Sequence, residues 1–264
     1  PDNSLYILDM YHGIIQHRTY VTSYLRKQIL SRGLDKPGKG HGRIYRVRHK
    51  DQARGPAPRL TKLSPDELTR YLGHPNGWWR DTAQRLIVER GSEANRAALE
   101  AILQGEKPLA RLHSLWCLEG LGLLNAEHIA RSLKSGDEKL ASSALMAGLA
   151  LSERDKNALL PALAAFKAGR ESSIYKARLL ADTGTPQSLD ALVAELKLNG
   201  RNALVREAAL TGLKDREAVF LGVNNGRYND GSLDKWLQEA LQKNVRKIEP
   251  PTIKGEHLAS FQRG

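Results

Sequence analysis

The feature that most limits the fold of this chain is a repeat of about 30 residues. Small side chains recur beside large apolar ones, and the recurring small residues are Ala83, Ser114, Ala144, Ala177 and Ala208. Their separations are 31, 30, 33 and 31 residues. A period of this length fits two antiparallel helices, with the small residue where neighbouring helices approach each other. We therefore expect an α-solenoid, in which each helix pair buries its apolar face against the next pair.

Helix signals fill the chain from residue 64 to about residue 243. At the start of this region, Ser64 suits an N-cap, Pro65 the first helical position and Glu67 the capping-box position. About eleven or twelve helices follow, and each ends at Gly, Asn, Asp or Ser. We predict a mainly α protein in which residues 64–243 form HEAT-like helical repeats, arranged as about five or six pairs. Residues 244–264 are interpreted as a tail or a truncated continuation of the repeats.

Residues 1–50 show a different pattern. Leu5–Leu8 is a short apolar run that suits a buried strand, and Arg43–Arg48 alternates charged with apolar side chains, which is typical of a half-buried strand. Between them, Thr19–Ser31 has the apolar spacing of a helix. Because two strands do not make a stable sheet alone, we interpret this region as a remnant of a larger β domain with a helical insertion. Residues 51–63 are predicted to be a linker.

The charge and cysteine content exclude several classes of protein. The chain has 264 residues and a net charge of +12, of which +8 lies in residues 1–60, where 12 Lys and Arg oppose 4 Asp and Glu. Cys117 is the only cysteine, which excludes an internal disulfide framework, a multi-cysteine metal site and a CxxCH haem-attachment motif. No apolar stretch approaches the roughly 18 residues of a membrane span, so we expect none. The chain opens with Pro1 and has no initiator Met, and we expect it to be a segment of a longer protein.

Several stretches resemble a known family of proteins. Two kinds of segment carry the likeness, one similar to the last blade of a β-propeller and one similar to the HEAT repeats that follow it. They are Asp9–Tyr20, Tyr24–Ile29 and Gly42–Val47 for the blade, and His74–Leu86 and Ala110–Trp116 for the repeats. Together they resemble the membrane-bound dehydrogenases of the Planctomycetes–Verrucomicrobia group. Those proteins join a propeller similar to the soluble glucose/sorbosone dehydrogenases to HEAT repeats, often followed by a c-type cytochrome domain.

The resemblance implies a function for a longer parent protein. That parent would oxidise a sugar-like alcohol with pyrroloquinoline quinone, pass the electrons to haem c, and be exported to the periplasm or cell surface. Residues 1–50 would be the last propeller blade, and the repeats would be an interaction and spacer region. The expected partners are the other propeller blades and a cytochrome c domain of the same parent. The segment itself would hold no cofactor and would be inactive alone.

Candidate catalytic residues lie directly after the first expected strand. In a propeller blade, His17 and Arg18 would sit in a loop that faces the central channel. His17 could take a proton from an alcohol, and Arg18 could hold a quinone or an acidic substrate. The alternative is structural: both residues would join Asp9 and Tyr20 in a hydrogen-bonded cluster that fixes the turn between blade and helix.

A second group of residues suggests packing between domains. Trp78 and Trp79 are adjacent, and on a helix their side chains point about 100° apart. One is expected to pack between repeats while the other covers the propeller or the linker. Arg80 and Asp81 are expected to bridge to a neighbouring repeat, and Trp116 is assigned to the same packing role.

Two further sites have competing interpretations. His113 and Cys117 are four residues apart on one expected helix, a spacing that could supply two metal ligands. No third or fourth ligand has motif spacing, so we interpret both as core residues and predict no metal. A HEAT-like nucleic-acid-binding module or DNA glycosylase would use Trp78, Trp79 and Asp81 on a concave face. The excess positive charge lies outside the repeats, which disfavours that alternative.

Overall fold

The computed structural model describes residues 2, 4–12, 14, 18–36, 41–51 and 59–248. The chain divides into two compact units. Unit 1 comprises Pro1–Lys62 with Asn76–Trp79, and unit 2 comprises Leu63–Pro75 with Arg80–Gly264. His17 and residues 249–264 lie outside the described part of the chain.

Unit 1 contains a two-stranded antiparallel sheet. Strand β1 (Leu5–Asp9) pairs with β2 (Arg43–Val47), so that Leu5 lies opposite Val47 and Asp9 opposite Arg43. Three short helical segments belong to the same unit: η1 (Arg18–Tyr20), α1 (Ser23–Ser31) and η2 (Leu60–Lys62). The side chain of Thr22 caps α1 by accepting the amide of Leu25. The two strands and the helix between them lie where the sequence pattern predicts them.

The burial predicted for the strands is wrong. Leu5–Leu8 was expected to be buried and Arg43–Arg48 half-buried, yet apolar side chains on both faces of the sheet are exposed, among them Leu8 and Ile44. The reason is that, within the described residues, β1 and β2 pair only with each other. A single two-stranded layer leaves each strand one unpaired edge and gives neither face a covering layer.

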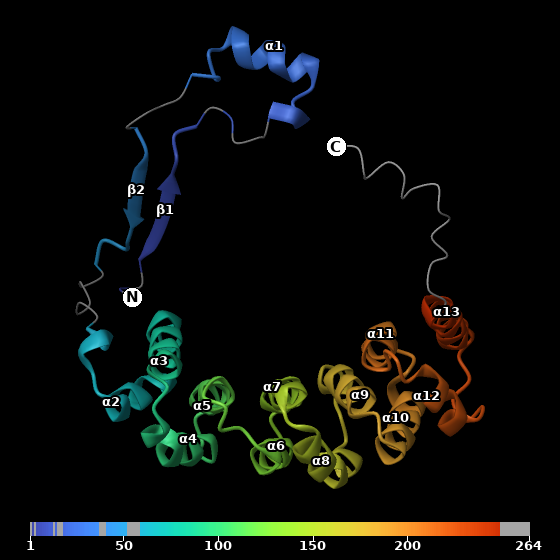
Figure 1. Ribbon diagram of the computed structural model, residues 1–264. Coiled ribbons are helices and arrows are strands. Elements are labelled where there is room, and N and C mark those ends of the chain that lie inside the picture. Colours follow the sequence, from blue (N-terminus) through green and yellow to red (C-terminus); the bar gives the residue numbers. More distant parts are fainter. Residues whose placement is uncertain are drawn as a thin grey trace, which may run out of the picture. The chain divides into compact units, whose positions relative to one another are not determined.

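Unit 2 is an α-solenoid built from two rows of helices (Figure 1). The outer row contains α2 (Pro65–Thr69), α4 (Arg96–Leu103), α6 (Ala126–Leu133), α8 (Glu153–Ala165), α10 (Pro186–Asn199) and α12 (Glu217–Asn224). The inner row contains α3 (Gly77–Arg90, of which Arg80–Arg90 belong to unit 2), α5 (Pro108–Gly120), α7 (Glu138–Ala147), α9 (Ser172–Thr183), α11 (Ala203–Gly212) and α13 (Gly231–Ile248). Short 3-10 segments complete it: η3 (Arg70–Gly73), η4 (Glu93–Asn95) and η5 (Gly148–Ala150).

The contacts between helices follow the order of the repeat. In the inner row α5 packs on α7, α7 on α9, α9 on α11 and α11 on α13, and in the outer row α6 packs on α8 and α10 on α12. The predicted helix start is confirmed: Ser64 and Glu67 form a capping box ahead of Pro65. The last helix continues to Ile248, beyond the predicted end near residue 243. No helix in the described residues is long and apolar enough to cross a membrane.

The repeated small residues do lie where inner-row helices meet, with one exception. Ala83, Ser114, Ala144 and Ala177 are completely buried. The fifth position is wrong by one residue, because Ala208 is partly exposed whereas Ala209 is completely buried. Two neighbouring alanines cannot be told apart by composition, and the direction in which α11 turns toward α9 decides which one is enclosed.

Helices α9 and α11 approach each other very closely in the inner row. A Cβ atom placed on Gly212 would lie 2.6 Å from the Cβ of Ala181 and 2.8 Å from the carbonyl oxygen of Arg178. A methyl group has no room there, so glycine lets the two helix backbones meet. Side-chain volume at such positions therefore sets the spacing of the inner row.

Candidate functional site

The candidate catalytic pair is only partly described. His17 lies outside the described residues, and the backbone of Arg18 begins η1. Of the alternative cluster, Asp9 uses its Oδ1 to accept the amide of Tyr11 at 2.9 Å, and Tyr20 is exposed. The roles of His17 and Arg18 in catalysis or in fixing the turn remain predictions.

The two adjacent tryptophans have different environments. The side chain of Asn76 accepts the amide of Trp78 at 2.9 Å at the start of α3. The two indoles meet edge to face, with ring centroids 5.8 Å apart and an angle of 85° between the planes. Trp79 is 8% exposed and Trp78 is 41% exposed, as expected for neighbours that diverge around a helix. Trp116 is half-buried on α5, and the assignment of all three to packing between domains stays a prediction.

Arg80 joins three parts of unit 2. Its Nη1 donates to the carbonyl oxygens of His74 at 2.6 Å and Pro75 at 3.0 Å, in the turn before α3. Its Nε donates to Nε2 of His113 on α5 at 3.2 Å. Arg206 makes the same pair of backbone bonds before α11, to the carbonyl oxygens of Gly200 and Arg201. This recurrence indicates a structural element of the repeat, which holds the loop leading into an inner-row helix.

His113 is a hydrogen-bonding link between α3 and α5. Because Arg80 donates to its Nε2, the ring is neutral with its proton on Nδ1, which lies 2.6 Å from Oε1 of Gln84. Burial and the nearby charge of Arg80 lower the pKa of His113, against the raising effect of Asp81. The carboxylate of Asp81 is 4.0 Å from Nε2 and well exposed. Arg80, Gln84 and His113 thus form a hydrogen-bonded link between adjacent repeats.

Cys117 is unsuited to metal binding or nucleophilic chemistry. It is completely buried, and burial raises the pKa of its thiol to about 12. A thiol that stays protonated at neutral pH is neither a good ligand nor a good nucleophile. In the part of the chain that the structure describes, no three His, Cys, Asp or Glu side chains converge into a cluster that could hold a metal ion.

Glu138 caps a helix of the next repeat. Its Oε1 accepts the amides of Glu171 at 3.1 Å and Ser172 at 2.9 Å, and its Oε2 accepts the hydroxyl of Ser172 at 3.0 Å. A carboxylate at a helix N-terminus satisfies free amides and complements the helix dipole. Because Glu138 begins α7 and the amides begin α9, this cap fixes one repeat to the next.

Two lysines make buried ion pairs within the solenoid. Nζ of Lys176 on α9 lies 2.8 Å from the carboxylate of Glu195 on α10 and donates to the carbonyl oxygen of Phe166, also at 2.8 Å. Nζ of Lys156 on α8 lies 2.7 Å from the carboxylate of Asp182 on α9. Charged groups that are removed from water need such partners. These lysines are therefore fixed in the interior and not offered to a ligand.

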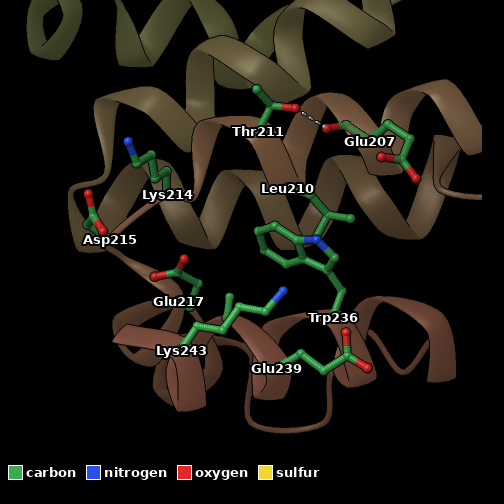
Figure 2. A pocket seen from close by; sticks show the side chains of 10 residues that line it. Glu207, Leu210, Thr211, Lys214, Asp215, Glu217, Trp236, Glu239 and Lys243 are labelled. Atoms are coloured by element: carbon green, nitrogen blue, oxygen red, sulfur yellow. Dashed lines mark hydrogen bonds between the residues drawn. The ribbon is translucent and has the colours of Figure 1, made fainter. Parts of the chain in front are cut away.

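The solenoid surface also has two open grooves. One, of about 670 Å³, lies between α11 and α13 and includes Leu210 and Trp236 (Figure 2). The other, of about 990 Å³, lies beside the starts of α9 and α11 and includes Ile174 and Leu204. Sequence reasoning missed both, since an exposed apolar residue on an amphipathic helix is not distinguishable from a core residue by its spacing alone.

Comparison with known protein families gives a match for the N-terminal region of the chain. Residues 1–51 match a family model described as a domain of unknown function, DUF7133. No curated protein matches the chain. One similar solved structure is a crystal structure of an engineered protein, with 16% sequence identity, 67% of this chain and 95% of that chain covered, and a TM-score of 0.43. The matched family range thus covers the strand pair and α1 and ends before the solenoid begins.

Proposed function

We propose that the solenoid is an interaction and spacer region, which holds the N-terminal β region of a longer protein at a fixed distance from a partner. The observation that carries this proposal is how its polar side chains are used. Glu138, Arg80, His113, Lys156 and Lys176 all bond one helix of the stack to another. These polar and charged side chains stabilise the contacts between helices, and a spacer requires such rigidity.

The partner surface is the exposed apolar part of the inner row. Leu109 on α5, Met146 on α7 and Leu204 on α11 are all exposed, and the three residues lie on three different inner-row helices. Large apolar side chains on a rigid support are effective anchors for a protein partner, because little conformational entropy is lost on binding. An inner row with several such anchors fits a folded protein better than a small ligand.

The nature of the parent is the finer part of the proposal. The resemblance of the blade-like and HEAT-like segments supports a dehydrogenase-like parent, exported from the cytoplasm, that oxidises a sugar-like alcohol and passes electrons to a cytochrome c. In such a parent, pyrroloquinoline quinone and haem c would be held by other domains. The described residues of unit 1 form two strands, the helix α1 and two short 3-10 segments, and no chemical step is assigned to them.

The proposal is tested by measuring binding of a small c-type cytochrome to the immobilised chain. We expect saturable binding that weakens at least tenfold, or about 1.4 kcal/mol, when Leu109, Met146 and Leu204 are together replaced by serine. Leu198→Ser is the control, because Leu198 is even more exposed than these three residues but belongs to the outer-row helix α10. Absence of binding would refute the cytochrome as partner, and equal loss in the control would refute the inner row as the surface.

The same binding measurement on the immobilised chain, with duplex DNA in place of the cytochrome, tests the nucleic-acid alternative. Residues 1–60 carry +8 and the remaining residues only +4, so most of the excess positive charge that phosphate contacts would use lies outside the solenoid. We expect no binding to duplex DNA that depends steeply on salt. Salt-dependent binding that is lost in Trp78→Ala or Asp81→Ala would favour the alternative, since released counterions make such binding sensitive to ionic strength.

A further inference from the structure

The inner row opens at its last step. Between α9 and α11 the helices meet so closely that only glycine fits at residue 212. Between α11 and α13 they diverge and leave the groove of about 670 Å³. Seven polar or charged side chains and three apolar ones line it, and the apolar ones are Leu210, Trp236 and Ala240. The change from close packing to an open groove occurs within one repeat.

The floor of this groove includes apolar surface that stays exposed to solvent. Figure 2 shows Trp236 rising from α13 toward Leu210 of α11. Leu210 is 6% exposed, but Trp236 retains 36% of its surface. In a solenoid each pair is covered by the element that follows it in the stack. Trp236 lies on the last pair that the structure describes and keeps an exposed apolar surface that a following segment could cover.

The sequence that follows α13 has the composition of a capping segment. Helix α13 ends at Ile248, and sixteen residues, 249–264, follow it in the chain. Pro250 and Pro251 disfavour continuation of a helix. The large apolar residues beyond them are Ile253, Leu258 and Phe261, and the last two have the three-residue spacing of one helix face.

The segment is long enough to reach the groove. Trp236 and Lys243, seven residues apart on α13, mark the length of the groove at about 10 Å, and Lys243 lies about 8 Å before Ile248. Sixteen residues span up to about 50 Å when extended. A chain that reverses direction after α13 therefore reaches Trp236 with residues to spare, entering from the Lys243 end.

We propose that residues 249–264 cap the solenoid in the intact chain, with Leu258 and Phe261 against Trp236 and Leu210 in the groove between α11 and α13. The rim carries charges of both signs, including Glu239 and Lys243. The segment carries Lys254 and Glu256, one of each sign, so a polar rim can form around an apolar contact. This contact is independent of the interaction surface proposed above, which lies on other residues.

The test uses Trp236 as the reporter in the full chain. The signal of Trp236 is the difference between the fluorescence of each form and that of its Trp236→Phe counterpart. We expect that replacing Leu258 and Phe261 together by serine shifts this signal to longer wavelength and increases its quenching by acrylamide. A chain that ends at Ile248 should show the same two changes. A synthetic peptide of residues 249–264 should reverse them in that shortened chain, and the peptide with both serines should not.

The control is Ile253→Ser, which alters the same segment outside the predicted contact. Its Trp236 signal should be closer to that of the wild type than the signal of the double serine variant is. An unchanged signal in the double variant and in the shortened chain would overturn the proposal, whatever the partner assays show. A Trp236 signal that changes on tenfold dilution, together with a dimer by light scattering, would also overturn it, because a second copy would then cover the groove. Circular dichroism at 222 nm checks that each form keeps its helices.

Discussion

The strand pair of unit 1 and the solenoid of unit 2 bury their apolar side chains to very different extents. Leu8 in β1 is 74% exposed, whereas Leu118 in α5 is completely buried. The solenoid helix finds its partners within about one repeat along the chain, since α5 contacts α4 and α7. A strand needs hydrogen-bonding neighbours and a second layer that can lie far away in sequence. The solenoid therefore buries its apolar side chains with helices that are close in sequence, whereas the two strands cannot bury theirs without further elements.

The same contrast holds for charged groups. The ion pair of Arg46 with Asp2 in unit 1 is partly exposed to water, while that of Lys176 with Glu195 is almost completely removed from it. Exposed pairs contribute little to stability, but a buried charge that loses its partner is strongly destabilising. The pair of Lys176 with Glu195 is therefore expected to matter more for stability than the pair of Arg46 with Asp2.

The largest expected effect comes from breaking the buried pair. Lys176→Met should lower the free energy of unfolding of the solenoid by about 3–5 kcal/mol, because the carboxylate of Glu195 remains buried without its cation. Urea denaturation followed by circular dichroism measures this. Adding Glu195→Leu should restore most of the loss, since the unpaired charge is then removed together with its partner. Equal loss in the single and the double variant would show that the site depends on volume and not on charge.

The sequence predicts those features of the solenoid that depend on local repetition, and it does not predict those that depend on neighbouring helices. The small residues at Ala83, Ser114, Ala144 and Ala177 gave the period, because a close approach between helices excludes large side chains. The error at Ala208 and the unpredicted extension of α13 to Ile248 concern rotation and length, which depend on neighbouring helices. The polar links were only partly visible. Arg80 was expected to bridge repeats, but the cap made by Glu138 on Ser172 joins residues 34 apart and has no local pattern.

The second prediction compares one leucine from each region. Leu118→Ala should lower the free energy of unfolding by about 2–5 kcal/mol, because it leaves a cavity in the close-packed interior of the solenoid. Leu8→Ala should change it by no more than about 0.5 kcal/mol, since the side chain is already in water. Both variants are measured by urea denaturation of the chain. A loss of several kcal/mol at Leu8 would mean that β1 is covered in solution, which would remove the contrast.

The smallest expected effect concerns the pH dependence contributed by His113. Burial and Arg80 lower its pKa in the folded chain, so between that pKa and 6.5 the unfolded state binds a proton that the folded state does not. Stability from this residue is complete above pH 6.5 and declines as the pH falls below it, with a slope of at most about 1.4 kcal/mol per pH unit for one proton.

The measurement is the free energy of unfolding between pH 7 and pH 5, compared with that of His113→Gln. The glutamine variant keeps a hydrogen-bonding side chain toward Gln84 and Arg80 but does not titrate, so its curve should be flatter below pH 6.5. Because the ring is only partly buried, the difference in slope should be well under the limit for one proton. A wild-type curve that is flatter than that of the variant would contradict this prediction, because the contribution of His113 to the pH dependence would then have the opposite sign. It would mean that Asp81 holds the ring in its charged form across the α3–α5 contact.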